Sequence, residues 1–193
     1  DGHGGISIAL QAKERLHSLI FEHEKTLTTE QALIQSFFAF HEEIKSESDR
    51  VGTTATVALV RSNKLYVANV GDSRGYRYSD GELDQLTTDH SLVADLVREG
   101  SLSPDEAAVH PQRNILTRVL GVYDEVPVDA FAVEPRHGDR YVLCSDGLSD
   151  MVELEDIQLT MSTFGANLQT LARQLVLLGN DNGGRDNISV VLV

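Results

Sequence analysis

The sequence predicts an α+β protein, because three blocks with different periodicity follow one another along its 193 residues. The first block has apolar residues at helical spacing, and the second consists of short runs rich in β-branched and aromatic residues. The third block returns to two helical patterns before one closing strand. No repeat or linker interrupts this order, so we expect a single domain over residues 1–193 in which helices cover a core built from strands.

Two amphipathic helices are predicted near the amino terminus. Residues 5–24 carry apolar side chains at roughly helical spacing, which are Ile6, Leu10, Leu16, Leu19 and Ile20. Thr28 and Gln31 form the pattern of a capping box, which predicts the start of a second helix. The apolar side of this second helix is formed by Leu33, Ile34, Phe37, Phe38 and Ile44.

The middle of the chain predicts an antiparallel meander of short strands. Its strand-like runs are residues 54–61, 64–70, 74–79 and 82–88. The turn pairs Ser62-Asn63 and Asp80-Gly81 separate runs within this meander. Later patterns predict strands over residues 128–135, 140–146 and 187–193, and helices over residues 153–162 and 167–179.

Residues 89–116 break the strand pattern with a long excursion. Within it, Ser103 is followed by Pro104 and Glu106, which predicts one short helix in an otherwise irregular segment. Connections of this length are often functional, so we treat residues 89–116 as a distinct subregion of the domain.

The composition excludes several classes of protein. The 30 acidic and 16 basic residues give a formal charge of −14, which argues against a nucleic-acid or anionic-membrane partner. No run approaches the roughly 18 apolar residues of a membrane span, and the amino terminus lacks the layout of a signal peptide. The single cysteine, Cys144, lies in an apolar strand-like run and is predicted to be a buried, inert thiol. We therefore expect a soluble, cytoplasmic protein.

Three aspartates in tight turns are candidates for a metal site. Asp1, Asp146 and Asp186 each lie within one residue of Gly or Asn, at the start or end of a strand-like segment. Glycine lets the backbone turn sharply, which leaves the carboxylate and nearby carbonyls facing one point. Such oxygen ligands suit Mg²⁺ or Mn²⁺. Taken singly, each pattern is also explained as a turn signal without a ligand role.

Asp72 and His3 extend this set of candidates. Asp72 ends an apolar strand at a Gly-Asp-Ser turn, where a hairpin corner is an equally good explanation. His3 lies beside Asp1 and could supply a proton to a leaving group at neutral pH, although a turn histidine on the surface is the alternative. We expect surface positions for His90 and His110.

Other catalytic schemes lack their sequence patterns. The chain contains no G-x-S-x-G elbow, no G-x-x-x-x-G-K-[ST] phosphate loop, no Cys/His cluster spaced for zinc and no calcium loop of the EF-hand type. Metal-assisted hydrolysis is the scheme that remains.

Four stretches in this order resemble the metal-dependent protein serine/threonine phosphatases of the 2C type. They are "DGHGG", "GTTATVALVRSNKLYVANVGDSRGYRY", "LCSDGLSD" and "GGRDNISVVLV". A further stretch, "HPQRNILTRVLG", makes the chain similar to the bacterial branch. The resemblance covers nearly the whole chain, and the ordered set is far more specific than any one of its members.

The resemblance implies a four-layer αββα sandwich of two antiparallel sheets flanked by helix pairs. It also implies a site for two Mn²⁺ or Mg²⁺ ions, in which Asp1 bridges both ions, Asp146 and Asp186 hold the first, and the Gly2 carbonyl helps to hold the second. In this family a water between the ions attacks phosphorus in line, and His3 matches the general acid that protonates the departing Ser or Thr oxygen.

Further roles follow from the same resemblance. Asp72 together with Asp146 matches a third, weaker metal site of the bacterial members, and Asp150 is a further candidate for it. Residues 89–116 correspond to a mobile flap beside the site, which handles substrate and release. The expected substrates are phosphorylated proteins, and the expected form is a monomer.

The chain departs from the family pattern at its start. The family begins with strands that carry a phosphate-gripping Arg and an acidic ligand of the second metal, and the sequence has no match for them before Asp1. We therefore expect a catalytic domain that is incomplete at its amino terminus, with reduced activity in this form. The alternative is a non-catalytic phosphatase-like regulatory or binding domain that keeps the fold without turnover.

Overall fold

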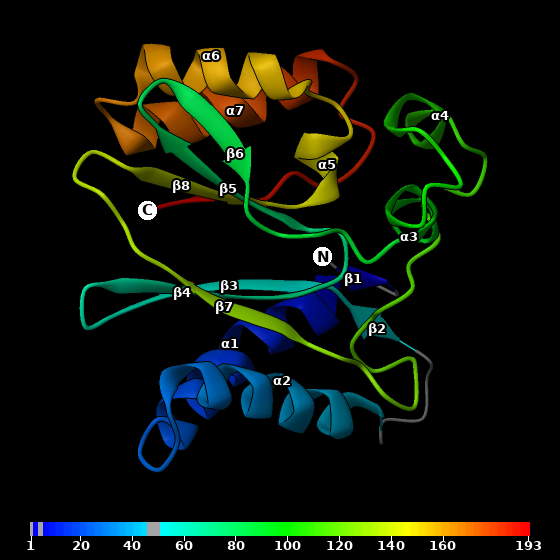
Figure 1. The fold of residues 1–193 in the computed structure, drawn as a ribbon, viewed down its shortest axis with the longest axis vertical. Coiled ribbons are helices and arrows are strands. Elements are labelled where there is room, and N and C mark those ends of the chain that lie inside the picture. Colours follow the sequence, from blue (N-terminus) through cyan, green and yellow to red (C-terminus); the bar gives the residue numbers. More distant parts are fainter. Residues whose placement is uncertain (1, 4–5, 46–50) are drawn as a thin grey trace. The chain divides into compact units, whose positions relative to one another are not determined.

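The computed structural model describes residues 2–3, 6–45 and 51–193, with side chains described from Ser7 onward. Within these residues the chain forms two compact units, each with an antiparallel sheet and a pair of helices (Figure 1). The first unit comprises Asp1–Asp72 and Thr88–Val133, and the second unit comprises Ser73–Thr87 and Glu134–Val193.

The main sheet of the first unit has three antiparallel strands in the order β3-β4-β7. β3 (Ala55–Arg61) and β4 (Lys64–Val70) form a hairpin, and β7 (Asp129–Val133) pairs with the other edge of β4. In the hairpin turn, Ser62 and Asn63 have φ values of 48° and 61°. Two-residue hairpin turns favour this left-handed backbone, so the turn pair expected from the sequence is confirmed.

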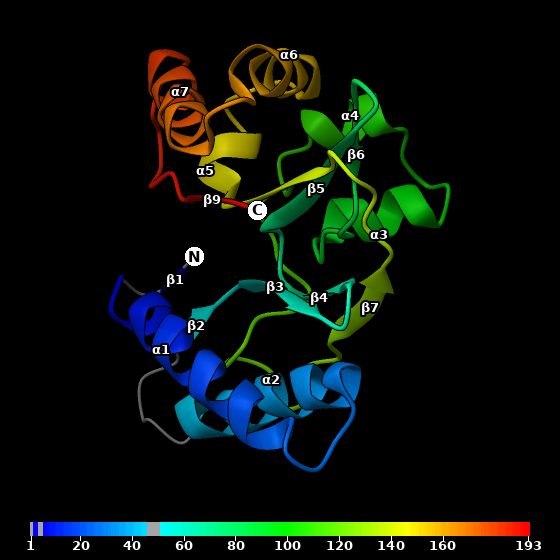
Figure 2. The ribbon, with the colours of Figure 1, turned by 90° about the vertical axis from the view of Figure 1, so that its left-hand side faces the viewer.

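Helices α1 (Ile6–His23) and α2 (Thr29–Lys45) cover one face of this sheet (Figures 1 and 2). The capping box at the start of α2 is confirmed. The Thr28 N–H donates to Gln31 Oε1 at 3.3 Å, and the Gln31 N–H donates to Thr28 Oγ1 at 3.4 Å. Both bonds satisfy N–H groups that the first helical turn leaves without an intrahelical partner.

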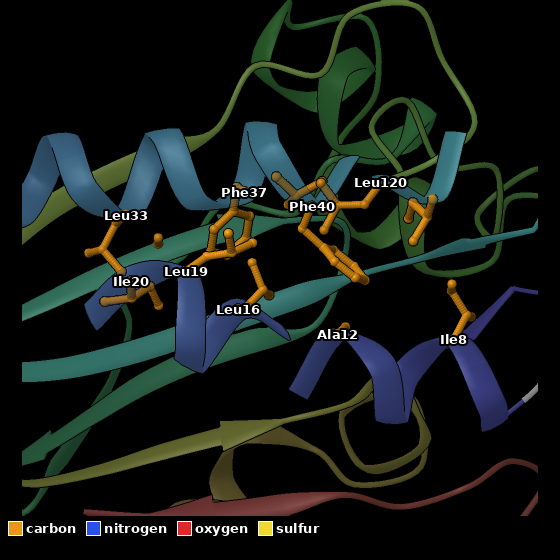
Figure 3. Close-up of a cluster of buried hydrophobic side chains, with 12 residues drawn as sticks. Ile8, Ala12, Leu16, Leu19, Ile20, Leu33, Phe37, Phe40 and Leu120 are labelled. Carbon is orange, nitrogen blue, oxygen red and sulfur yellow. The ribbon is translucent and has the colours of Figure 1, made fainter. Parts of the chain in front are cut away.

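A cluster of buried apolar side chains joins the two helices to the sheet (Figure 3). Its members on the helices include Leu16, Leu19, Ile20, Leu33, Phe37 and Phe40. Two apolar residues that the sequence pattern placed on the same faces are exposed instead, because Leu10 is 56% and Phe38 is 53% accessible. The apolar pattern of each helix is wider than the stripe that the contact buries.

The first unit also contains four short elements. β1 (Gly2–His3) and β2 (Gly52–Thr53) form a two-stranded sheet, and α3 (Leu92–Arg98) and α4 (Pro104–Ala108) lie in the 89–116 segment. The short helix expected after Ser103 is confirmed as α4. α3, β1 and β2 were not expected from the sequence.

The sheet of the second unit has four antiparallel strands in the order β6-β5-β8-β9. These strands are β5 (Arg74–Ser79), β6 (Glu82–Gln85), β8 (Arg140–Cys144) and β9 (Val190–Leu192). The single-turn helix α5 (Asp146–Ser149) follows β8, and helices α6 (Leu154–Phe164) and α7 (Leu168–Asp181) complete the unit (Figure 2). Its apolar core includes Tyr76, Val142, Cys144, Leu148, Ile157, Met161, Leu171 and Leu175.

One expectation about strand pairing is wrong. The four runs from residue 54 to residue 88 do not form one meander, because β3 and β4 belong to the first unit and β5 and β6 to the second. The chain turns at Gly71, where φ is 107°, instead of folding β5 back onto β4. Asp72 is therefore in a link between two sheets and not at a hairpin corner.

The α+β class is confirmed, with two antiparallel sheets that are each covered by a helix pair. The buried position of Cys144, which is 4% exposed, is also confirmed. None of the helices in the described residues has the length and apolar character needed to cross a bilayer.

Candidate metal centre

Asp146 and Asp186 come together in the second unit because neighbouring strands end beside them. β8 and β9 are antiparallel, with Cys144 opposite Val190. Beyond this pair, β8 continues into Asp146, and the segment that leads into β9 begins near Asp186. An antiparallel pair brings the end of one strand to the start of its partner, so the two aspartates lie at the same end of the sheet.

Ser145 joins the two segments by hydrogen bonds. Its hydroxyl donates to the Asn187 carbonyl at 3.0 Å and accepts the Ser189 N–H at 3.0 Å. Its backbone N–H donates to the Ser189 carbonyl at 3.1 Å. Ser145 is 5% exposed, so these bonds are made away from solvent, where they hold the two segments firmly.

Gly147 allows the two segments to touch. A Cβ atom at this position would lie 2.3 Å from the Asn187 carbonyl oxygen and 3.4 Å from the Asp186 carbonyl carbon. These are backbone atoms, so a side chain at Gly147 would force the segments apart. The glycine expected from the sequence to permit a close approach does so here.

Backbone N–H groups orient both carboxylates. The Gly147 N–H donates to Asp146 Oδ1 at 2.8 Å, and the Asn187 N–H donates to Asp186 Oδ1 at 2.7 Å. Asp146 is half-buried and Asp186 is exposed. Two oriented carboxylates on adjacent turns form a donor set of hard oxygen ligands, which fits Mg²⁺ or Mn²⁺.

Gly2 lies at the edge of the first unit. β1 pairs with β2, so that Gly2 is opposite Thr53 and His3 is opposite Gly52. Thr53 in turn exchanges backbone hydrogen bonds with Leu120, at 3.1 and 3.0 Å. The backbone of β1 is thereby tied to the body of the first unit.

Asp72 directly follows the turn at Gly71 and is half-buried. A Cβ atom on Gly71 would lie 2.3 Å from Thr54 Cγ2, so this turn packs against the residue that follows β2. The structure therefore connects the Gly2 and Asp72 positions through the short segment from Thr53 to Thr54.

The other candidates take different positions. Asp1 lies outside the described residues, and nothing is described of the His3 side chain. Asp150 is exposed at the end of α5, where its N–H donates to the Asp146 carbonyl at 2.8 Å. Within the described part of the chain, no group of three or more His, Cys, Asp or Glu side chains is arranged to hold a metal ion.

The sequence analysis missed two residues near these positions. Ser145 carries no signal beyond its place before Asp146, and its bridging role arises from partners 42 and 44 residues away. His90 was expected at the surface, but it is 1% exposed and contacts Gly71. A polar residue in a loop-like run gives no local sign of such burial.

Comparison with known proteins identifies the family. Residues 1–96 match the family described as protein phosphatase 2C. The chain is 36% identical over 205 aligned positions to the serine/threonine phosphatase stp of Listeria monocytogenes, an alignment that covers 100% of this chain and 80% of the Listeria protein. The chain belongs to the protein phosphatase 2C family. This confirms the resemblance carried by the four sequence motifs.

Solved structures of serine/threonine phosphatases agree with this assignment. The crystal structure of the Mycobacterium tuberculosis serine/threonine phosphatase PstP/Ppp matches with a TM-score of 0.87 and 35% identity, and the match covers 100% of this chain and 84% of that one. The catalytic domain of PstP in complex with two manganese ions matches with a TM-score of 0.80 and 33% identity, over 100% and 84% of the two chains.

Proposed function

We propose that the chain removes phosphate from phosphoserine and phosphothreonine in proteins, with two divalent cations held by Asp1, Gly2, Asp146 and Asp186. Membership in the 2C family makes the chain a protein serine/threonine phosphatase that depends on divalent metal. The structural observation that supports the proposal is the close approach of Gly147 to the Asn187 carbonyl, because it brings the backbones of the Asp146 and Asp186 turns together.

The aspartates have distinct roles in this proposal. Asp146 and Asp186 would hold the first ion, Asp1 would contribute to both ions, and the Gly2 carbonyl would contribute to the second. When bound, the two ions would supply an acidified water as nucleophile and would offset charge on the phosphoryl oxygens. Mn²⁺ and Mg²⁺ both suit these oxygen ligands.

His3 is the general acid in the proposed reaction. Its imidazolium donates a proton to the seryl or threonyl oxygen as the bond from that oxygen to phosphorus breaks. A histidine can act as acid or base at neutral pH, which suits this role. Asp72 is proposed as a ligand of a third, weaker cation together with Asp146.

Substitution of the carboxylates tests the proposal. With Mn²⁺ present, Asp146→Asn and Asp186→Asn should each lower phosphate release from a phosphothreonine peptide by at least about a hundredfold. The reason is that an amide in place of the carboxylate removes the negative charge of one metal ligand. Asp181→Asn, which changes an exposed carboxylate at the end of α7, is the matched control and should keep full activity.

Two outcomes would contradict the proposal. One is hydrolysis that persists unchanged in excess chelator, which would exclude metal-assisted chemistry. The other is an Asp146→Asn variant as active as the Asp181→Asn control, which would remove Asp146 from the site.

A further inference from the structure

His90 is a buried histidine at the base of the 89–116 segment, and the proposed chemistry does not use it. Its backbone and ring contact three parts of the first unit that are distant in sequence. These parts are the turn after β4, the end of the 89–116 segment and the start of β7. A buried side chain with fixed partners on each side is held in one orientation.

The first contact joins His90 to Gly71 at two points. The Gly71 N–H donates to His90 Nδ1 at 3.0 Å, and the His90 N–H donates to the Gly71 carbonyl at 3.0 Å. Gly71 has a φ of 107° and packs against Thr54, so this turn has little freedom to relax. Asp72 is the next residue. The two hydrogen bonds between His90 and Gly71 therefore fix the backbone position from which the Asp72 side chain extends.

The second contact closes the base of the 89–116 segment. The Thr117 N–H donates to the His90 carbonyl at 2.9 Å, and the Leu92 N–H donates to the Ile115 carbonyl at 2.8 Å. Ser91 and Leu116 form an antiparallel bridge between these two bonds. Both ends of the segment therefore meet at His90, and α3 and α4 extend from this closed base.

The third contact runs to Asp129 at the start of β7. His90 Nε2 lies 3.0 Å from Asp129 Oδ2. Since Nδ1 accepts the hydrogen bond of the Gly71 N–H, a neutral ring carries its hydrogen on Nε2, and this N–H donates a hydrogen bond to Asp129 Oδ2. Arg118 donates to the other carboxylate oxygen at 2.7 Å, and the register of the sheet places Asp129 opposite Asn69 in β4.

From these contacts we infer that His90 is a positioning residue, which locks the base of the 89–116 segment to the turn that carries Asp72. The inference rests on the proposed function in one respect, the assignment of Asp72 as a cation ligand. A ligand must stay within about 0.5 Å of its working position, so a looser turn weakens cation binding at Asp72. A looser base also frees the 89–116 segment.

His41 is a matched control in the same unit. It is also 1% exposed, and its Nδ1 also accepts a glycine N–H, from Gly121 at 3.0 Å. It contacts neither the turn at Gly71 nor the base of the 89–116 segment in any described hydrogen bond. Substitution of His41 therefore shows the effect of losing a buried imidazole while the contacts of His90 with Gly71 and with the base of the 89–116 segment remain.

Hydrogen exchange in the metal-free protein tests the lock directly. His90→Leu fills similar space with an apolar side chain but removes the hydrogen bonds of the ring, and it should speed exchange at residues 71–73 and 90–93 by at least about tenfold. His90→Asn keeps an oxygen that can accept the Gly71 N–H, so it should restore part of the protection at residues 71–73. A side chain that only fills space would give the reverse order, with Leu better tolerated than Asn.

Activation by Mn²⁺ tests the consequence for the site. His90→Leu and Asp72→Asn should each raise the Mn²⁺ concentration for half-maximal phosphatase activity by at least about fivefold, and the double variant should need no more Mn²⁺ than Asp72→Asn alone. His41→Leu should match the wild type in this titration. Effects that multiply in the double variant would overturn the inference, because they would mean that His90 and Asp72 act independently.

Asp129→Ala provides a second route if His90→Leu does not fold. The Asp129 side chain is 40% exposed, so its removal leaves a smaller packing defect, and exchange at residues 90–93 should still rise. Asp124→Ala, which removes an exposed carboxylate paired with Lys45, is its control and should leave these residues unchanged.

The two proposals fail in different ways. Wild-type exchange at residues 90–93 in both His90→Leu and Asp129→Ala would overturn the positioning role of His90, whatever the metal titration shows. An unchanged Mn²⁺ requirement in Asp72→Asn would overturn the ligand role of Asp72. The exchange rates would then still decide whether His90 holds the base of the 89–116 segment to the turn at Gly71.

Discussion

At the scale of single residues, Gly147 is the most constrained position beside the carboxylates. We expect Gly147→Ala to separate the Asp146 and Asp186 turns, because the new methyl group would collide with the backbone carbonyl of Asn187. The affinity for Mn²⁺, measured by titration, should fall by about tenfold or more, and overpacking should cost roughly 1–3 kcal/mol of stability.

Gly138→Ala separates these two effects. Gly138 lies in the same unit and has a φ of 93°, but a Cβ atom there would meet nothing within 4 Å. Backbone strain should lower the free energy of unfolding by about 1–2 kcal/mol and leave Mn²⁺ affinity unchanged. Equal loss of Mn²⁺ affinity in both variants would show that the contact at Gly147 has no special role.

Asp139, which precedes β8 while Asp146 follows it, makes stability depend on pH. Its side chain is 2% exposed, and burial alone would raise its pKa. Hydrogen bonds from the Arg136 N–H, Ser79, Arg77 and Tyr141 outweigh this and lower the pKa of Asp139 from 3.8 to about 2. A carboxyl group whose pKa is lower in the folded than in the unfolded protein stabilises the fold at pH values above the unfolded-state pKa. This contribution is lost as the pH falls toward the folded-state pKa.

Asp139→Asn should therefore remove about 2 kcal/mol of stability at pH 7. It should also flatten the decline in unfolding free energy between about pH 4 and pH 2. Urea unfolding at a series of pH values measures both effects. Asp80→Asn, at a neighbouring carboxylate that is 89% exposed, should keep the wild-type slope. If Asp139→Asn also kept the wild-type decline of unfolding free energy with pH, Asp139 would not be the group that causes it.

Single residues differ in how much of their role could be predicted. Asp146 and Asp186 stand beside residues that favour sharp turns, at the ends of strand-like runs, so local pattern made them candidates for a shared site, with simple turns as the alternative. The partners of His90 are 19 and 39 residues away, and its own neighbours are polar. Its burial depends on tertiary contacts that local pattern does not encode.

At the scale of elements, the capping box of α4 offers a local test. The Ser103 N–H donates to Glu106 Oε2 at 2.8 Å, and the Glu106 N–H donates to Ser103 Oγ at 3.3 Å. Ser103→Ala should destabilise α4 by about 1 kcal/mol, seen as faster hydrogen exchange over residues 104–108. Ser101→Ala, at an exposed serine of the same segment, should leave exchange over these residues unchanged. Identical exchange in the two variants would contradict a role of Ser103 in stabilising the start of α4.

Long periodic elements were predictable, and short ones were not. The helices α1, α2, α6 and α7 have enough turns to show an apolar stripe. β1 and β2 have two residues each and α5 has four, which is too short for any period to appear. The start of α3 did carry a sequence signal, because Ser91 is a residue type that favours the N-cap position. In the structure its hydroxyl accepts the Ala94 N–H at 3.3 Å.

At the scale of the whole molecule, the sequence order of the strands does not reveal which sheet each one joins. β4 and β5 are consecutive, yet β4 pairs with β7 and β5 pairs with β8. Such pairings join residues 60 or more positions apart, and local patterns carry no information about them. The family resemblance supplied the expectation of two sheets that periodicity alone did not.

In the proposed reaction, carboxylates from separate turns bind divalent cations for phosphate hydrolysis. Calorimetric titration of the metal-free phosphatase with Mn²⁺ tests it most directly. The account predicts that Asp146→Asn and Asp186→Asn each weaken Mn²⁺ binding by at least about tenfold, while Asp181→Asn binds as the wild type does. Unchanged Mn²⁺ binding in both Asp146→Asn and Asp186→Asn would contradict it.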